Sequence, residues 1–198
     1  MRDDLFAREV RGAVEGGDVR GAVDRILSRH GAAFYGYIAS LVQDESLAAE
    51  AFQLFSVRLW ESLEGFRWES RLSTWAYRIA RNAAYRTLED PYRRRAARLG
   101  TVEQERLAAS WTRTTTAAWR RTEAKQRLWE EVEGLSPEDR EILVLRLGRK
   151  MSWTEVAAVI HGLEGHVEEK ALARHAAKVR KRFQRLKEVL AKSMSASD

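Results

Sequence analysis

The chain lacks cysteine altogether, and it has only 2 prolines in 198 residues. The absence of cysteine excludes disulfide bonds and thiolate metal sites, and it fits a reducing compartment. Long apolar runs are also missing: the longest, Val156–Ile160, has five residues, whereas a membrane-spanning helix needs about 20. The opening "MRDDLFAREV" places acids where a signal peptide needs an apolar core. We therefore expect a soluble protein that stays in the cytoplasm.

What the chain does contain is helical periodicity and positive charge. It is 44% hydrophobic and 32% charged, with a formal net charge of +6. No alternating strand pattern or Asn-Gly hairpin signal persists, whereas apolar residues recur at helical spacing almost everywhere. The charge balance favours a polyanionic partner. We predict an all-α fold of two small helical domains, an N-terminal helical bundle and a C-terminal helix-turn-helix, joined by a linker.

Three segments define the predicted domain organisation. The first domain covers 1–90, because a residue that precedes proline disfavours helix and Pro91 follows Asp90. The second covers 123–198. Between them, 91–122 mixes Thr, Trp and Arg without a clean apolar stripe, and we interpret it as a partly helical linker. One continuous helical hairpin is the alternative for this segment.

In the first domain, apolar spacing predicts helices within 17–44, followed by a helix that ends at Gly65 and another that ends near Asp90. Residues before the first of these helices form a short leading segment. The side chains that we expect to be buried by the helices of 17–44 are Val23, Ile26, Leu27, Phe34, Ile38 and Leu41.

In the second domain, two capping signals mark helix starts. Ser136 is an N-cap followed by Pro137, and the helix that they open ends at Gly148. Ser152 and Glu155 form a capping box that opens the next helix. A basic helix then runs from about 168 to 192. Two short helices joined by a tight Gly turn, followed by a basic helix, make a helix-turn-helix pattern.

The basic helix contains nine Lys or Arg and three Glu between residues 168 and 192, which gives a local charge of +6. At 100° per residue, one stripe is apolar and packs inward. It consists of Val179, Phe183, Leu186 and Leu190. The opposite face is suited to the major groove of DNA, where Arg and Lys contact guanine and Gln pairs with adenine. The candidate contacts are Arg174, Lys178, Arg180, Lys181, Arg182, Gln184 and Arg185. The alternative is a solvated cationic helix.

A second stretch, "SRLSTWAYRIARNAAYR", combines arginine and aromatic residues. Its inward face consists of Leu72, Trp75, Ala76, Ile79 and Ala83. Its outward face consists of Arg71, Thr74, Tyr77, Arg78, Arg81 and Tyr85, with Asn82 at the margin. Such a face suits single-stranded nucleic acid, because bases stack on rings while Arg follows the backbone. The loop before it contains Phe66, Arg67 and Trp68. Trp75 is interpreted as a core residue, whereas Trp68 and Tyr85 fit either the core or a nucleic-acid contact.

Enzyme chemistry finds no support in the motifs. The sequence has no phosphate loop, nucleophile elbow or His-Glu-x-x-His pattern. His161 and His166 lie near Glu164 in the sequence and could bind a metal ion, but we expect neither a metal site nor a cofactor. The stretch "WEEVEGLSPEDRE" is rich in acids, of which Glu138 and Asp139 fit helix-start positions. A contact of these acids with a basic protein partner is the alternative.

Together these stretches resemble the extracytoplasmic-function (ECF) sigma factors, a class of bacterial transcription initiation factors. The resemblance covers roughly 18–90 and 123–190. It rests on "AAEAFQLFSVRLW", "STWAYRIARNAAYR", "LSPEDREILVLRLGRKMSWTEVAAVI" and "VRKRFQRLKEVL", which are similar to family patterns and occur in the family's order. Helix and linker order also agree with that family.

The resemblance implies partners and a role for each site. The partners are core RNA polymerase, contacted at the clamp helices of the largest subunit and at the flap, promoter DNA, and an anti-sigma factor. Residues implied to contact the clamp are Glu50, Gln53, Leu54 and Arg58. The unpaired −10 bases would be bound by Phe66, Arg67, Trp68, Ser70, Thr74, Arg78 and Asn82, with Arg81 and Tyr85 on the same predicted face. The basic helix would read the −35 element as a duplex, and the linker would thread toward the RNA exit path.

Departures from the family pattern leave some points open. Glu50 and Leu54 replace an Asp and an acid, which affects the polar detail of the clamp contact. The segment 161–177 is about ten residues longer than the short turn that usually precedes this helix in the family. We expect a longer helix rather than an extra loop, because residues 168–177 have high helix propensity. Two other classes of protein remain: a repressor that binds its operator without polymerase, and a helical adaptor.

Overall fold

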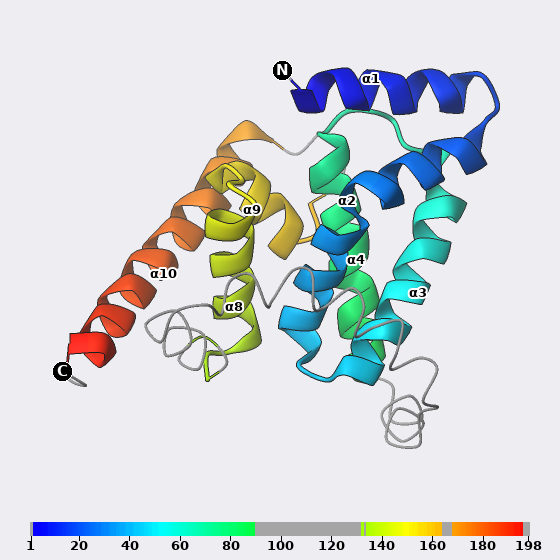
Figure 1. The fold of residues 1–198 in the computed structure, drawn as a ribbon. Helices are drawn as coiled ribbons and strands as arrows, with labels where there is room; N and C mark the ends of the chain where they lie inside the picture. The colour runs from blue at the N-terminus through cyan, green and yellow to red at the C-terminus, as the bar shows by residue number, and fades with distance from the viewer. Residues whose placement is uncertain (1, 90–131, 133, 164–167, 196–198) are drawn as a thin grey trace. The chain divides into compact units, whose positions relative to one another are not determined.

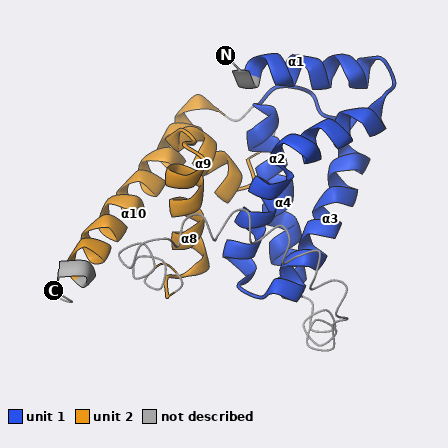
Figure 2. Cartoon of the chain, in the orientation of Figure 1, with its two compact units in different colours: residues 1–112 blue, residues 113–198 orange. Residues whose placement is uncertain are grey.

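The computed structural model is all-α over the residues that it describes, in agreement with the predicted fold class (Figure 1). The chain divides into two compact units, 1–112 and 113–198 (Figure 2). The predicted linker, 91–122, lies outside the described part. The described residues are 2–89, 132, 134–163 and 168–195.

The first unit contains four described helices, whose bounds are α1 Arg2–Glu15, α2 Val19–Val42, α3 Glu45–Leu63 and α4 Leu72–Glu89. Aspartate N-caps open two of them: Asp18 accepts a hydrogen bond from the backbone N–H of Gly21, and Asp44 accepts one from Leu47. Each cap satisfies an N–H that has no partner within the helix. The ends of α3 and α4 fall within two residues of the predicted boundaries. Helix α1 was not predicted, because its residues were interpreted as a short leading segment.

The core of the first unit is made where α2, α3 and α4 contact one another, while α1 contacts α2. Aromatic rings fill its centre: Phe34 lies 4.8 Å from Tyr77 and 5.0 Å from Phe55 between ring centroids. Full burial of one such side chain contributes about 1.5–3 kcal/mol. Five of the six residues predicted to be buried in 17–44 are buried, and Leu27 is half-buried.

The second unit contains α8 Pro137–Leu143, the π-helical turn η1 Val144–Gly148, α9 Trp153–Ile160 and α10 Glu169–Ser195. Both predicted capping signals are confirmed: Ser136 caps α8 and accepts from the N–H of Asp139, and Ser152 with Glu155 forms a capping box on α9. The predicted stop at Gly148 is also confirmed. The last turn before it is wider than an α-helical turn, because the N–H of Arg149 bonds to the carbonyl of Val144 at 3.0 Å.

Helix α10 includes part of the segment 161–177, for which we expected a longer helix. It begins at Glu169 and is continuous through Arg174 and His175, so residues 169–177 extend the helix, as expected. Its predicted apolar stripe is confirmed in the main: Val179, Phe183 and Leu186 are buried and Leu190 is half-buried. Phe183 packs edge-on against Trp153 of α9, with ring centroids 5.1 Å apart.

Candidate nucleic-acid and partner interfaces

The outward face of α10 carries a row of cationic side chains. Opposite the apolar stripe, the residues at i, i+4, i+7 and i+11 are all exposed; they are Arg174, Lys178, Lys181 and Arg185. Arg180 and Gln184 beside the row are exposed as well. Six of the seven predicted duplex contacts are therefore accessible to a ligand.

Arg182 is the exception. Its Nε donates to Oδ1 of Asp139 at 2.5 Å, a second nitrogen donates to Glu138, and a third donates to the Ser136 hydroxyl at 3.2 Å. Burial of the Asp139 carboxyl raises its pKa, but hydrogen bonds from Arg182 and Ser136 and the charge of Arg182 outweigh burial and hold the pKa below its ordinary value. The geometry thus assigns Arg182 to the packing of α10 on α8, rather than to the exposed row.

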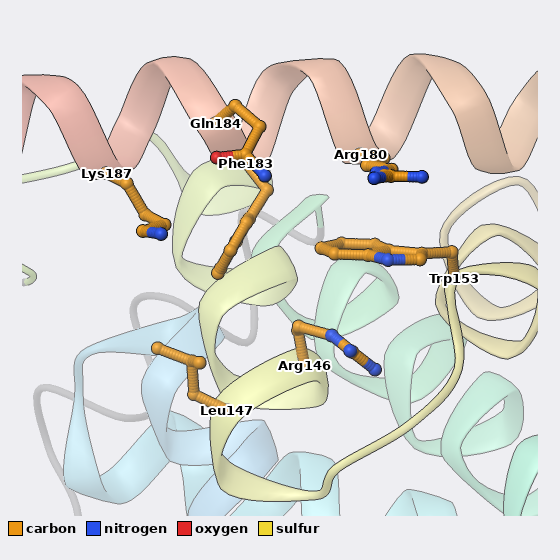
Figure 3. Close-up of a pocket in the computed structure, with 7 residues that line it drawn as sticks. All are labelled: Arg146, Leu147, Trp153, Arg180, Phe183, Gln184 and Lys187. Carbon is orange, nitrogen blue, oxygen red and sulfur yellow. The ribbon is translucent and has the colours of Figure 1, made fainter.

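Where η1, α9 and α10 meet, there is a pocket of ≈ 450 Å³. Figure 3 shows the Trp153 ring between the α10 side chains and Arg146, whose guanidinium carbon lies 4.5 Å from the ring centroid. The residues that line the pocket include three cations and no acid; they are Arg146, Leu147, Trp153, Arg180, Phe183, Gln184 and Lys187. The pocket places Arg146 and Trp153 beside the predicted contacts Arg180 and Gln184. Sequence reasoning did not single out these two residues, because they are 34 and 27 positions from Arg180 in the chain.

On α4, part of the predicted outward face is wrong. Thr74, Tyr77 and Arg78 are buried, at 5%, 5% and 7% exposure. The physical reason is that α4 contacts both α2 and α3, so its buried arc is wider than one apolar stripe. Tyr77 shows this directly, since its ring packs edge-on against Phe34 and, at 5.2 Å, against Tyr37.

The remaining part of the α4 face is accessible. Asn82 is exposed, and Arg81 and Tyr85 are partly exposed. The guanidinium carbon of Arg81 lies 4.4 Å from the centroid of the Tyr85 ring. A cation and a ring in this arrangement offer one charge and one stacking surface to the same strand of nucleic acid.

The loop before α4 holds a series of aromatic contacts. Phe66 is stacked on Trp75 with centroids 4.5 Å apart and planes at 21°, and Trp68 contacts Phe66 at 4.8 Å. Trp75 and Phe66 are buried, which confirms the core interpretation of Trp75 and removes Phe66 from the accessible surface. Trp68 is partly exposed, and Arg67 and Ser70 beside it are exposed. Only the outermost ring of the series can therefore meet a base.

Trp68 also has an unusual backbone conformation, with a φ of +59°. A non-glycine residue in the left-handed region costs about 1–2 kcal/mol. Strain of this kind persists where surrounding contacts determine it, and it gathers at functional sites. Packing against Phe66 supplies such a contact here.

Helix α3 presents the residues implied to contact the polymerase. Gln53 and Arg58 are exposed, Glu50 and Leu54 are partly exposed, and Arg58 pairs with Glu61 at 2.9 Å. Sequence reasoning missed two neighbours, Val57 and Trp60.

Val57 and Trp60 are 50% and 56% exposed. With Gln53 they form the i, i+4, i+7 stripe of α3, which we call the α3 stripe. Single exposed apolar residues are common on protein surfaces, but Val57 and Trp60 lie one turn apart on the same face, and a contiguous apolar patch marks a surface that contacts another protein. The sequence does not reveal this exposure, because Val57 and Trp60 stand among other apolar residues of the helix. Phe55 and Leu59 have the helical spacing of the buried side.

The described residues hold neither a membrane-spanning helix nor a metal-binding cluster. No described helix is long and apolar enough to cross a membrane. Among the same residues, no group of three or more His, Cys, Asp or Glu is placed to hold a metal ion.

Part of the chain matches a known protein family. Residues 26–98 match the family described as Sigma-70 region 2. The match begins within α2, includes α3 and α4, and leaves out α1 and the second unit. It supports a sigma-70 family factor and indicates a role in transcription initiation with RNA polymerase. No curated protein and no solved structure matches the chain.

Proposed function

We propose that the chain is an ECF-type sigma factor, which binds core RNA polymerase and directs it to promoters by contacting the −10 and −35 elements. The observation that carries this proposal is the match of 26–98 to Sigma-70 region 2, whose span contains both the α3 stripe and the loop of Trp68. Such a factor acts by binding, so its own chain needs no catalytic group, and it would act in the cytoplasm.

The first unit is proposed to hold the unpaired bases of the −10 element. The accessible groups are the partly exposed ring of Trp68, the Arg81–Tyr85 pair and the exposed Arg67, Ser70 and Asn82. Rings provide stacking that tolerates any base, while arginine follows the phosphates. The buried Phe66, Thr74 and Arg78 would support this surface from within and would not touch bases in this conformation.

The second unit is proposed to read the −35 element as a duplex. An α-helix fits the major groove, and the exposed row of α10 offers Arg and Lys to guanine and Gln184 to adenine. The pocket beside it adds Arg146 and Lys187, which are suited to backbone phosphates because no acid lines the pocket. Arg182 is left out of this interface because its donors are bonded to α8.

Helix α3 is proposed to dock on the clamp helices of the polymerase through the α3 stripe, Leu54 and the polar Glu50 and Arg58. An exposed tryptophan is a frequent anchor of protein interfaces. An anti-sigma factor that holds the chain inactive is proposed to compete for these surfaces, and the flap remains a proposed contact of the second unit.

The deciding experiment is run-off transcription with purified core polymerase on a set of genomic fragments, with and without the full chain. We expect initiation from defined start points only when the chain is present. Specific binding to duplex DNA without any gain in initiation would contradict the proposal and would indicate an operator-binding regulator. A chain that neither initiates nor binds DNA would indicate an adaptor.

A narrower test concerns the duplex-reading face. Lys181→Ala and Arg185→Ala should each weaken use of the −35 element by about 1–3 kcal/mol if the side chains contact bases. The measurement is run-off transcription on templates with intact and scrambled −35 sequence. Arg182→Ala is the matched control, because it removes a cation of the same helix that is bonded to α8. Full −35 selectivity in both test variants would rule out the proposed face.

A further inference from the structure

Helix α1 lies outside the residues matched to Sigma-70 region 2, yet apolar contacts dock it on the same unit. Phe6 and Val10 are buried, at 6% and 0% exposure. The Phe6 ring packs edge-on against His30 of α2 at 5.2 Å, and the guanidinium carbon of Arg29 lies 4.5 Å from the centroid of the Phe6 ring. The position of α1 on α2 is therefore set by burial of these side chains.

This docking brings the charged side chain of Arg11 to the loop before α4. The guanidinium carbon of Arg11 lies 5.8 Å from the centroid of the Trp68 ring, within the range of a cation–π contact. Glu15, one turn further along α1, accepts a hydrogen bond from Nε of Arg11 at 2.8 Å. Arg11 is thus held over the outermost ring of the series that begins at Trp75.

We propose that Arg11 occupies the position over Trp68 in which an unpaired base stacks, so that α1 competes with single-stranded DNA for this ring. The inference rests on the proposed function, in which Trp68 is a stacking surface. A guanidinium and a nucleobase both bind to the face of an aromatic ring, and one face cannot hold both. Because a base stacks more strongly than an exposed cation–π contact holds, α1 lowers the affinity for the strand without abolishing binding.

The competition can be separated from simple charge effects with two probes and one matched control. The probes are fluorescein-labelled single strands of about 12 nucleotides, one of random sequence and one made only of abasic sites with the same phosphates. The variants of the full chain are Arg11→Ala and Arg8→Ala. Each removes one exposed arginine from α1, but only Arg11 is seen over the Trp68 ring among the described contacts.

Fluorescence anisotropy should show that Arg11→Ala binds the base-bearing strand about two- to fivefold more tightly than Arg8→Ala does, which corresponds to an exposed cation–π contact. The two variants should bind the abasic strand equally. In a Trp68→Ala background the difference between them should disappear. In the free protein, Arg11→Ala should also shift the indole N–H resonance of Trp68, which reports the contact without DNA.

Four results would overturn the inference. Weaker binding of the base-bearing strand by Arg11→Ala than by Arg8→Ala would mean that Arg11 itself contacts DNA. Equal binding, or an unmoved indole resonance, would mean that Arg11 does not occupy the ring. If neither the unaltered chain nor any variant binds the base-bearing strand more tightly than the abasic strand, the single-strand role of the proposed function fails as well. A preference that Arg11→Ala does not strengthen leaves that role intact.

Discussion

The cationic side chains of α10 fall into two groups, one exposed to solvent and one bonded to α8. Arg185 is exposed, whereas Arg182, three positions earlier, bonds to Ser136, Glu138 and Asp139 of the α8 start. The sequence presents both as members of one charged run. Only packing distinguishes them, because the acids that bind Arg182 lie more than 40 residues away in the chain. The same residue type thus serves stability at one position and, in the proposed function, recognition at the other.

The Arg182 contact predicts a loss of stability without a loss of DNA affinity. Arg182→Ala should lower the free energy of unfolding of the second unit by about 1–2 kcal/mol, because charge-assisted hydrogen bonds are lost from a partly exposed site. Urea denaturation followed through hydrogen exchange of α10 amides measures this loss. Duplex affinity at a temperature where the variant is folded should stay unchanged. A variant of unaltered stability and weakened duplex binding would return Arg182 to the DNA interface.

The same contact predicts a pH dependence. The pKa of Asp139 is lower in the folded chain than in the unfolded one, where it is about 3.9. Its contribution to stability is therefore fully present above about pH 4 and is lost as the pH falls through the lowered folded pKa. In Arg182→Ala, the carboxyl titration of Asp139 followed by NMR should move to higher pH. An unmoved titration would show that Arg182 does not hold this carboxylate in solution.

At Trp68, backbone strain and the proposed stacking role can be measured apart. Glycine accepts a φ of +59° without a steric penalty, whereas alanine does not. Trp68→Gly should therefore have a free energy of unfolding about 1 kcal/mol greater than that of Trp68→Ala, as measured by urea denaturation. Both variants should lose affinity for single-stranded DNA alike, because both lack the ring. Equal stability of the two variants would indicate that Trp68 leaves the left-handed region in solution.

Helix α3 carries the proposed contact with core RNA polymerase, and this contact can be tested at Trp60. Trp60→Ser should weaken binding to core polymerase by about 2 kcal/mol or more if Trp60 is an anchor of the interface, while the fold stays intact because the side chain is already 56% exposed. Leu5→Ser on α1, where Leu5 is 60% exposed, is the matched control. Pull-down and competition with labelled chain measure the affinity. Equal affinities of the two variants would place the polymerase contact elsewhere.

Helix boundaries in this chain follow from local chemistry, so the sequence predicts them well. Ser136 with Pro137 and the Ser152–Glu155 capping box act within one turn, and both begin helices where expected. Helix α1 was missed because, among its side chains from residue 4 to residue 15, only Phe6 and Val10 are deeply buried, too few for a periodic signal. Periodicity also failed on α4, since it identifies the most apolar stripe and cannot show that two other helices cover Thr74 and Arg78.

For the whole chain, the candidate surfaces were predictable in outline but not in detail. The outward row of α10 follows from its opposite apolar stripe, and the structure exposes it as expected. The exposure of Val57 and Trp60 was not predictable, because an apolar residue in a helix is expected inside. The clustering of Arg146 with Trp153 and Arg180 depends on tertiary packing across η1, α9 and α10.

If the whole chain has two separate DNA sites, as proposed, its affinities for duplex and for single-stranded DNA should depend differently on salt concentration. Duplex binding by the full chain should weaken with salt at a slope of about −0.9 per phosphate contacted in log–log form. Lys187→Ala should make that slope shallower by about 1, since Lys187 is proposed to meet a phosphate. Binding of a random single strand, measured with the same variant, should keep its slope. A shallower slope for both probes would mean that one surface binds both forms of DNA.

The bond between Arg182 and the start of α8 also sets an angle. Burial of Val179, Phe183 and Leu186 holds α10 on its neighbours, but apolar burial is non-directional and opposes small rotations about the helix axis less than a directed hydrogen bond does. Arg182 stands on the flank of that stripe and is tied to Glu138 and Asp139, so it acts as a stop against rolling. This stop fixes the angle of the outward row in the free chain. In the proposed function, the contacts of the row with the duplex hold the same angle on DNA, so the loss of the Arg182 bonds lowers stability and not affinity.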